Sequence, residues 1–245
     1  MPRIAIIAGS GLETSFSVRE SSGIDTPYGF VNISMLDMSG RVIVFLQRHG
    51  PAHSVPPHRI NYRANIFALK KADVEFVIAT NAVGSLRRRI RPGDFIVPDQ
   101  MIEFTKLRPS TFFEGEDGRV IHTDMTEPYS VTARNELVKS CQERGWRVHT
   151  SGVYVCAEGP RYETPAEITM FRRLGGDIVG MTGYPEAVLA KELGLKYATL
   201  CVATNYAAGL QQRISHDEVV ELMGKSMGKV KQVVEDTVTA LSSSL

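Results

Sequence analysis

The chain has 245 residues and a composition typical of a soluble globular protein, with 43% hydrophobic and 22% charged residues. Its 28 basic and 27 acidic residues nearly cancel, and no extended basic block points to a nucleic-acid partner. The length fits one α/β domain, which we expect to span residues 1–245.

The cysteines and the N-terminus indicate the compartment. Cys141, Cys156 and Cys201 form an odd set without CxxC spacing, which argues against a disulfide framework and against a structural zinc site. Reduced thiols in the cytoplasm are therefore expected. The apolar stretch near the N-terminus is broken by glycine too soon for a signal sequence or a membrane span, so no membrane partner is predicted.

Strand and helix patterns alternate along the chain, which predicts an α/β sheet. Apolar runs rich in β-forming residues predict strands at 4–8, 42–46, 74–79, 94–97, 153–156, 177–180 and 197–203. Helical spacing occurs at 59–71, 131–144, 165–174 and 185–193. Residues 105–124 lack a regular period and predict a long loop, a frequent place for functional residues.

The clearest helix pattern follows Ser215, a suitable N-cap with Glu218 at the third helical position. Beyond this start, apolar residues recur at helical spacing through about six turns. We expect this last helix to pack against the sheet.

Several segments that follow predicted strands have the composition of an anion site. Gly9-Ser10-Gly11 can present backbone N–H groups to an anion, although a plain tight turn explains it equally well. RHGPAHSVPPH at 48–58 joins an arginine, which offers forked donors to phosphate, to three histidines. Zinc is a weaker interpretation of these histidines because HExxH spacing and a nearby carboxylate are missing.

Two further segments, TNAVGSL at 80–86 and MTGYPEAVLAKELG at 181–194, also end predicted strands. Open α/β sheets place their ligands at this end of the strands. The helix start near Pro185 adds backbone N–H groups that favour an anion. A simple turn and a core methionine remain the alternatives for these two segments.

The segments EGPRYET at 158–164 and TNYAAG at 204–209 pair a carboxylate, Glu163, with an amide, Asn205. An ionised carboxylate only accepts hydrogen bonds, whereas an amide both donates and accepts. The pair suits a purine edge with an N1–H donor and an O6 acceptor. Hypoxanthine and guanine present this edge, and adenine does not.

Taken in order, six segments resemble the trimeric purine nucleoside phosphorylase and methylthioadenosine phosphorylase family over almost the whole chain: IAGSGLE, RHGPAHSVPPH, TNAVGSL, EGPRYETPAE, GMTGYPEAVLAKELG and ATNYAAG. Within the family, the sequence is most similar to S-methyl-5′-thioinosine phosphorylases and 6-oxopurine nucleoside phosphorylases. The resemblance implies a three-layer α/β/α fold with a mixed, partly barrel-like central sheet. It also implies inorganic phosphate as cosubstrate, no metal or organic cofactor, and a homotrimer, with a dimer of trimers as the larger alternative.

The resemblance assigns residues to three subsites. Those matching the phosphate site are Ser10, Arg48, His49, Asn81, Ala82 and Thr182. Those matching the base and ribose site are Val83, Gly84, Tyr162, Glu163, Met181, Asn205 and Ala207. The 5′-substituent pocket is matched by His216, Val220 and, from a neighbouring subunit, His122. The catalytic residues implied are Asn205, Glu163 and His49, of which Asn205 would hydrogen-bond N7 and O6 of the leaving base.

The expected activity is reversible, phosphate-dependent cleavage of 6-oxopurine nucleosides to free base and (methylthio)ribose 1-phosphate in purine salvage. Adenine-reading relatives have a serine at the position of Glu163 and aspartates at those of Asn205 and Ala207, so the resemblance implies a preference for 6-oxopurine over adenine nucleosides. S-methyl-5′-thioadenosine is the alternative substrate, and a non-catalytic nucleoside-binding protein is the alternative function. His216 favours inosine or guanosine, and the general pattern favours S-methyl-5′-thioinosine, so this choice stays open.

Two other classes of function compete with a phosphorylase. A non-catalytic nucleoside-binding protein would not need Arg48, His49 and Thr182 together. A nucleoside hydrolase would need a water-activating carboxylate or a metal-binding aspartate cluster, and the candidate loops contain neither.

Overall fold

The computed structural model describes residues 3–9, 12, 16–115 and 118–243. The strands are β1 (Arg3–Ala8), β2 (Val18–Thr26), β3 (Gly29–Met38), β4 (Arg41–Gln47), β5 (Val74–Ser85), β6 (Phe95–Ile96), β7 (Gln100–Phe104), β8 (Val148–His149), β9 (Val153–Ala157), β10 (Ile178–Gly180) and β11 (Lys196–Tyr206). The α-helices are α1 (Tyr62–Lys71), α2 (Val131–Glu143), α3 (Pro165–Arg173), α4 (Gly183–Glu192) and α5 (His216–Ser243).

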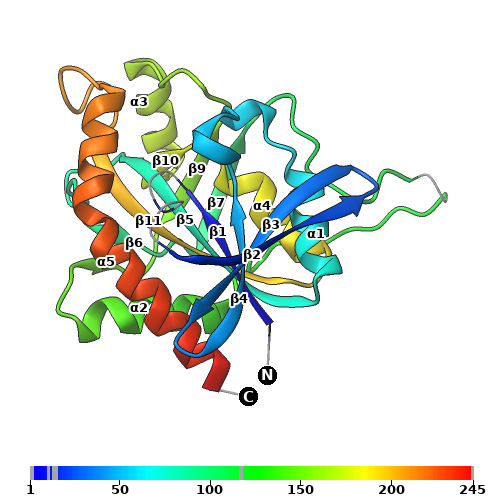
Figure 1. The fold of residues 1–245 in the computed structure, drawn as a ribbon. Coiled ribbons are helices and arrows are strands. Elements are labelled where there is room, and N and C mark those ends of the chain that lie inside the picture. Colours follow the sequence, from blue (N-terminus) through cyan, green and yellow to red (C-terminus); the bar gives the residue numbers. More distant parts are fainter. Residues whose placement is uncertain (1–2, 10–11, 13–15, 116–117, 244–245) are drawn as a thin grey trace.

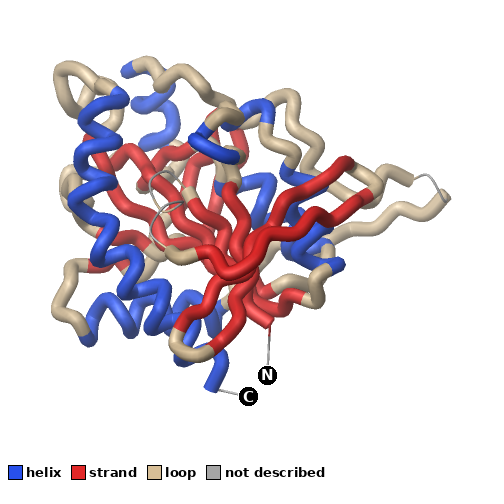
Figure 2. Tube along the Cα trace, in the orientation of Figure 1, coloured by secondary structure: helices blue, strands red, loops and turns tan. Residues whose placement is uncertain are grey.

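All strands belong to one mixed sheet, which Figures 1 and 2 show running through the middle of the molecule. Its main path has the order β2-β3-β4-β1-β5-β10-β9-β7, and β11, β6 and β8 branch from β5. The pairs β4-β1, β1-β5 and β5-β11 are parallel, whereas β2-β3, β3-β4 and β5-β10 are antiparallel.

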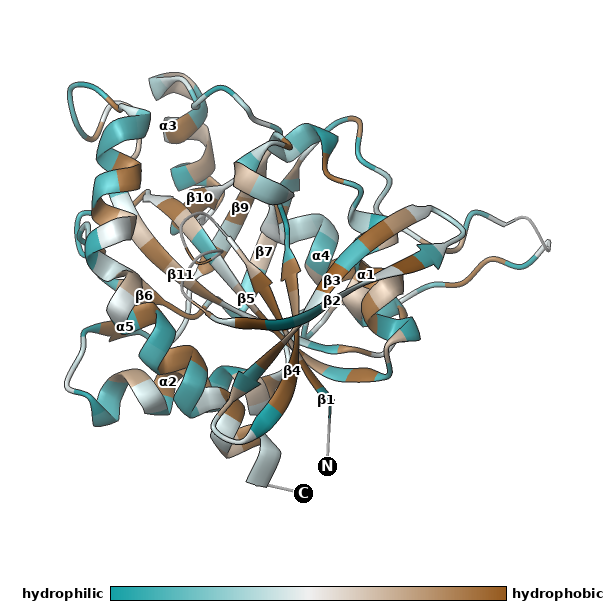
Figure 3. Ribbon diagram, viewed as in Figure 1, coloured by the Kyte–Doolittle hydropathy of each residue, from teal (hydrophilic) through white to brown (hydrophobic). Residues whose placement is uncertain are grey.

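Helices cover both faces of the sheet, as the contacts of alternate β1 side chains demonstrate. Ile4 and Ile6 belong to the hydrophobic cluster that includes α2 and α5, whereas Ala5 and Ile7 belong to the cluster that includes α1 and α4. Successive strand residues point to opposite faces, so a strand buried on both faces is a continuous apolar run. Figure 3 shows these hydrophobic strands between helices whose outward turns are hydrophilic. The expected three-layer α/β/α arrangement is confirmed.

The strand β5 changes its neighbour halfway along one edge. β1 pairs with β5 as far as Ala79, and β10 begins to pair at Gly84 and Ser85. Among the described residues, no strand pairs with residues 80–83 on that edge, while β11 pairs with the opposite edge throughout. The sheet therefore forks, and the carboxyl ends of β1, β4 and β10 converge on the opening. A change in strand order is where α/β sheets bind ligands.

The sequence predicted the buried strands and all five α-helices, but it missed β2, β3, β7 and β8. It also ended two strands too early. The segment TNAVGSL was expected to leave its strand, yet β5 continues through it to Ser85. In the same way, β11 continues to Tyr206 instead of ending at Ala203.

Candidate active site

A cavity of about 410 Å³ occupies the fork of the sheet. Thirteen of the sixteen site residues predicted from the sequence line it: Arg48, His49, Asn81, Ala82, Val83, Gly84, Tyr162, Glu163, Met181, Thr182, Asn205, Ala207 and His216. Ser10 lies outside the described residues. Val220 and His122 do not line the cavity.

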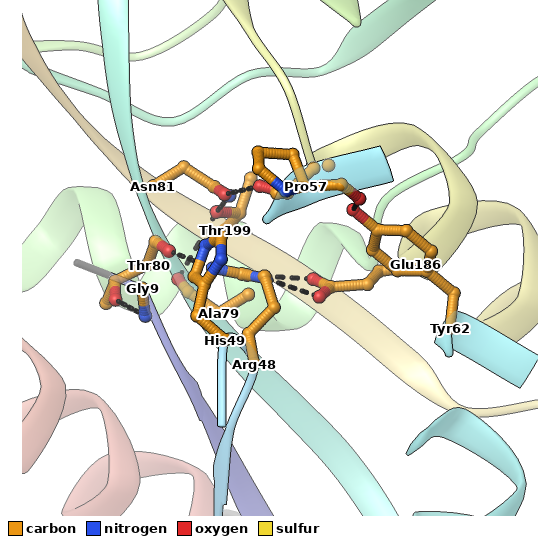
Figure 4. Close-up of polar contacts among 12 residues, drawn as sticks. Gly9, Arg48, His49, Pro57, Tyr62, Ala79, Thr80, Asn81, Glu186 and Thr199 are labelled. Atoms are coloured by element: carbon orange, nitrogen blue, oxygen red, sulfur yellow. Dashed lines mark hydrogen bonds and ion pairs between the residues drawn. The ribbon is translucent and has the colours of Figure 1, made fainter. Parts of the chain in front are cut away.

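Arg48 is held at one end of the cavity by a buried ion pair (Figure 4). Its Nε and Nη2 donate to the Glu186 carboxylate at 2.5 and 2.8 Å, and its Nη1 donates to the Thr80 carbonyl at 2.9 Å. Both charged side chains are 1% exposed. Burial lowers the pKa of Arg48, but the charge and hydrogen bonds of Glu186 outweigh it, so the pKa lies above its usual value. Three of the five guanidinium N–H groups are used, which leaves one on each Nη for an anion.

Glu186 was not predicted from the sequence. It lies in the first turn of α4, is 1% exposed, and also accepts a hydrogen bond from Tyr197 Oη at 2.9 Å. It therefore compensates the charge of Arg48 and fixes the orientation of the guanidinium.

His49 is a neutral imidazole whose tautomer is fixed. Its Nδ1 lies 2.9 Å from the Val55 carbonyl, which can only accept, so Nδ1 carries the proton and Nε2 is an acceptor. Burial, and then the charge of Arg48, lower the pKa of His49 to about 3. The His53 ring stacks on His49 with centroids 4.0 Å apart.

A chain of hydrogen bonds fixes Thr182 and Asn81. The Thr182 hydroxyl donates to Asn81 Oδ1 at 2.7 Å, and Asn81 Nδ2 donates to the Thr199 hydroxyl at 2.7 Å. Thr199 donates in turn to the Ala79 carbonyl at 3.3 Å. Because Thr182 directly precedes α4, backbone N–H groups at the start of this ten-residue helix add positive potential here.

Gly9 brings the first loop close to β5. Its N–H donates to Thr80 Oγ1 at 3.0 Å, and a Cβ at this position would lie 2.3 Å from the Thr80 carbonyl oxygen. No side chain fits at that distance. The glycine at the end of β1 is thus required for the chain to pass over β5 beside the cavity.

Glu163 also lines the cavity, as a carboxylate without an ion pair among the described residues. It is 9% exposed, and burial raises its pKa. The nearest arginine in the sequence, Arg161, instead forms a forked pair with Glu167 at 2.7 and 2.8 Å. Glu167 also completes the capping box of α3 with Thr164, which fixes the backbone directly after Glu163.

Asn205 is 5% exposed, and its amide is oriented by neighbours in β11. The Thr204 hydroxyl donates to Asn205 Oδ1 at 2.8 Å, and Asn205 Nδ2 donates to the Tyr206 carbonyl at 3.0 Å. One Nδ2 proton remains for a ligand. Gly84 leaves room beside this amide, because a Cβ there would lie 3.5 Å from Asn205 Nδ2 and 3.3 Å from Val179.

The start of α5 forms a further wall, and here the sequence prediction was wrong by one residue. Val219 is 8% exposed and lines the cavity, whereas Val220 is 54% exposed and does not. Successive helix residues differ by about 100° in direction, so Val220 points away from the cavity that Val219 lines. His216 lines the cavity from the first position of α5.

His122 is exposed within the predicted loop between β7 and α2. Figure 1 shows this loop reaching away from the body of the molecule. That His122 contributes to a neighbouring subunit's pocket remains a prediction.

The described residues contain no group of three or more His, Cys, Asp or Glu side chains placed to hold a metal ion. No helix in the same part of the chain is long and apolar enough to cross a membrane.

Comparisons with known proteins identify the family. Residues 3–239 match the phosphorylase superfamily. The chain is 48% identical to the 6-oxopurine nucleoside phosphorylase of Pyrococcus furiosus, over 96% of this chain and 91% of the relative. It is 47% identical to a probable S-methyl-5′-thioinosine phosphorylase of Methanothermobacter thermautotrophicus, over 98% and 85%.

Among solved structures, methylthioadenosine phosphorylase from Schistosoma mansoni in complex with adenine superimposes with a TM-score of 0.94 at 30% identity. The match covers 100% of this chain and 93% of that one. The chain therefore belongs to the phosphorylase superfamily, with the nucleoside phosphorylase fold, and is an enzyme of the pentosyltransferase class.

Proposed function

We propose that this enzyme catalyses the reversible, phosphate-dependent cleavage of 6-oxopurine nucleosides to free base and ribose 1-phosphate or methylthioribose 1-phosphate. The observation that carries the proposal is the pairing of a buried, unpaired carboxylate, Glu163, with the oriented amide of Asn205 in one cavity. The names of the relatives from Pyrococcus furiosus and Methanothermobacter thermautotrophicus support it.

The base end selects the purine by hydrogen-bond matching. Glu163 accepts from N1–H of hypoxanthine or guanine, and the remaining Nδ2 proton of Asn205 is donated toward O6 and N7. Adenine would place its unprotonated N1 against the carboxylate, which pairs two acceptors. A mismatched buried polar group costs about 1–3 kcal/mol, enough for tenfold or greater discrimination.

The other end suits phosphate, bound by Arg48, Thr182, the start of α4 and the backbone of β5 at Ala82. His49 presents an acceptor, so the phosphate oxygen opposite Nε2 carries a proton, or the imidazole takes one up when the dianion binds. The Glu186 carboxylate balances the positive charge of Arg48. Phosphate recognition by Arg48 therefore depends largely on the hydrogen bonds that its guanidinium donates.

The reaction needs no covalent enzyme intermediate. The C1′–N9 bond breaks with its electron pair moving into the purine, and a phosphate oxygen forms the new bond to C1′ from the opposite face. Asn205 stabilises the negative charge that develops on the base, and Arg48, His49 and Thr182 hold the phosphate in line. The enzyme acts in purine salvage in the cytoplasm, as a homotrimer in which His122 of one subunit completes the next subunit's 5′ pocket.

The test compares base release from S-methyl-5′-thioinosine, inosine, guanosine and S-methyl-5′-thioadenosine, with and without phosphate. We expect strictly phosphate-dependent release and a higher kcat/KM for the 6-oxopurine nucleosides. Release without phosphate would identify a hydrolase, and binding without turnover would identify a nucleoside-binding protein.

S-methyl-5′-thioadenosine phosphorolysis is the second candidate, because the chain shares its fold over its full length with the Schistosoma mansoni methylthioadenosine phosphorylase. Val219 provides an apolar wall near the 5′ end that would suit either methylthio nucleoside. A higher kcat/KM for S-methyl-5′-thioadenosine than for inosine and S-methyl-5′-thioinosine would establish this candidate and refute the assigned role of Glu163.

A further inference from the structure

Arg108, in the segment after β7, is a buried arginine with an acceptor for every N–H. Its side chain is 2% exposed. Nε donates to Glu158 Oε1 at 3.1 Å, Nη1 donates to the Met181 carbonyl at 2.5 Å and to Tyr62 Oη at 3.1 Å, and Nη2 donates to the carbonyls of Ala157, at 3.5 Å, and Glu158. A guanidinium has five N–H groups, so none remains for a ligand.

These acceptors belong to three separate walls of the cavity. Met181 itself lines the cavity, and Glu158 begins the segment that carries Tyr162 and Glu163. The third connection is indirect, because Tyr62 Oη accepts from Arg108. The same hydroxyl donates to the carbonyl of Pro57 at 2.9 Å (Figure 4). Pro57 also lines the cavity.

We propose that Arg108 is a positioning residue for the nucleoside half of the site, holding the Pro57, Glu158–Glu163 and Met181 walls at fixed separations. That the substrate of this site is a nucleoside rests on the proposed function. The residue touches neither the base nor the phosphate, and it acts only through the three segments it joins. No motif in the sequence marked it.

The charge of Arg108 is matched locally by Glu158. The Lys106 N–H donates to Glu158 Oε2 at 2.5 Å, so both carboxylate oxygens are engaged. Burial raises the pKa of Glu158, but the donors from Lys106 and Arg108 outweigh it and lower the pKa. Lysine has three donors and no planar fork, so it cannot replace all five hydrogen bonds of the arginine.

The experiment compares R108A and R108K with R144A, which removes an arginine that is also forked to a carboxylate, Asp236, but lies between α2 and α5. We expect R108A to lower kcat/KM for inosine about 100-fold, because displacement of about 1 Å in a site has effects of this size. R108K should recover little. Millimolar guanidinium should restore activity to R108A, whereas methylammonium should not, and R144A should stay within about threefold of the wild type.

Two further readouts are independent of turnover. Amide hydrogen exchange should increase in R108A at residues 157–163 and 181–183, and guanidinium should reverse the increase. If R108A does not fold, Y62F serves instead, because it removes only the hydroxyl that links Arg108 to Pro57, and it should raise the Kd for hypoxanthine about tenfold.

An R108A enzyme within threefold of R144A in kcat/KM would overturn the inference. Lost activity without increased exchange and without guanidinium recovery would also overturn it. A wild-type enzyme without phosphate-dependent cleavage would instead refute the proposed function, and the exchange measurement would still decide the role of Arg108.

Discussion

Glu163 is a carboxylate whose burial raises its pKa and which has no ion pair among the described residues. Because the folded pKa lies above the unfolded one, the folded state binds the proton more tightly. Stability therefore falls as pH rises through the unfolded pKa of about 4.3, and the cost is complete above the folded pKa. A side chain that is unfavourable for stability and lines a cavity is a candidate for function.

We predict that E163Q has a melting temperature at pH 7 equal to or above that of the wild type, and that the difference disappears near pH 4. The same variant should lose roughly 10- to 100-fold in kcat/KM for inosine, because a charged acceptor is replaced by a neutral amide oxygen, which accepts more weakly. Thermal unfolding at several pH values and steady-state kinetics check both parts. E167Q keeps the capping box of α3 and is the matched control; equal kinetic losses in the two variants would contradict the assignment.

The Arg48–Glu186 pair makes a different prediction. Removing one partner of a buried ion pair leaves an uncompensated charge, so E186M should lose about 3–5 kcal/mol of unfolding free energy. The double variant R48M/E186M should be more stable than E186M while losing phosphorolysis. Denaturant unfolding and phosphate-dependent kinetics measure the two effects. A double variant less stable than E186M would contradict this account of the pair.

Helix α5 presents one face to the cavity, and its two adjacent valines provide an internal control. V219S should reduce kcat/KM for S-methyl-5′-thioinosine about tenfold, since it places a hydroxyl in the apolar wall, and should change inosine less. V220S, on the exposed face, should leave both substrates unchanged. Equal effects of the two substitutions on the substrate ratio would show that this part of α5 does not contact the 5′ group.

The elements that could be predicted from the sequence are those with strong periodicity. β1, β5 and β11 are apolar runs because helices cover both of their faces, and α5 has a continuous apolar stripe. β2 could not be predicted in this way because its side chains are almost all exposed, and an exposed strand carries little hydrophobic pattern.

Site residues that stand in sequence motifs could be predicted. Site residues that come together only when the chain folds could not. Arg48 directly precedes His49 and Gly50 after a strand, and Asn205 stands in the TNYAAG segment at the end of another, which drew attention to both. Glu186 is 138 residues from its partner Arg48, and a glutamate in a first helical turn is usually explained by the helix dipole. Val219 and Val220 are adjacent and equally apolar, so the apolar pattern alone does not decide which of them faces the cavity.

In the proposed trimer, each complete active site uses residues from two subunits, and subunit mixing tests this directly. The native mass should be close to three times the chain mass of 27.0 kDa, or six times in a dimer of trimers. H122A and N205D should each be impaired, whereas trimers formed from both at equal amounts should recover about a quarter of intact sites, since loop and pocket then come from different chains. Mixtures no more active than the average of the parents would refute sharing of His122.

The fork in the sheet also determines what mutagenesis can detect. Among the described residues, the open edge of β5 at 80–83 exposes peptide groups to the cavity, and the Thr80 carbonyl already accepts from Arg48. A peptide group is the same whichever side chain it carries, so no substitution deletes it. Scanning this strand with alanine will therefore underestimate its share of ligand binding, and replacing single amides by esters is the way to measure it.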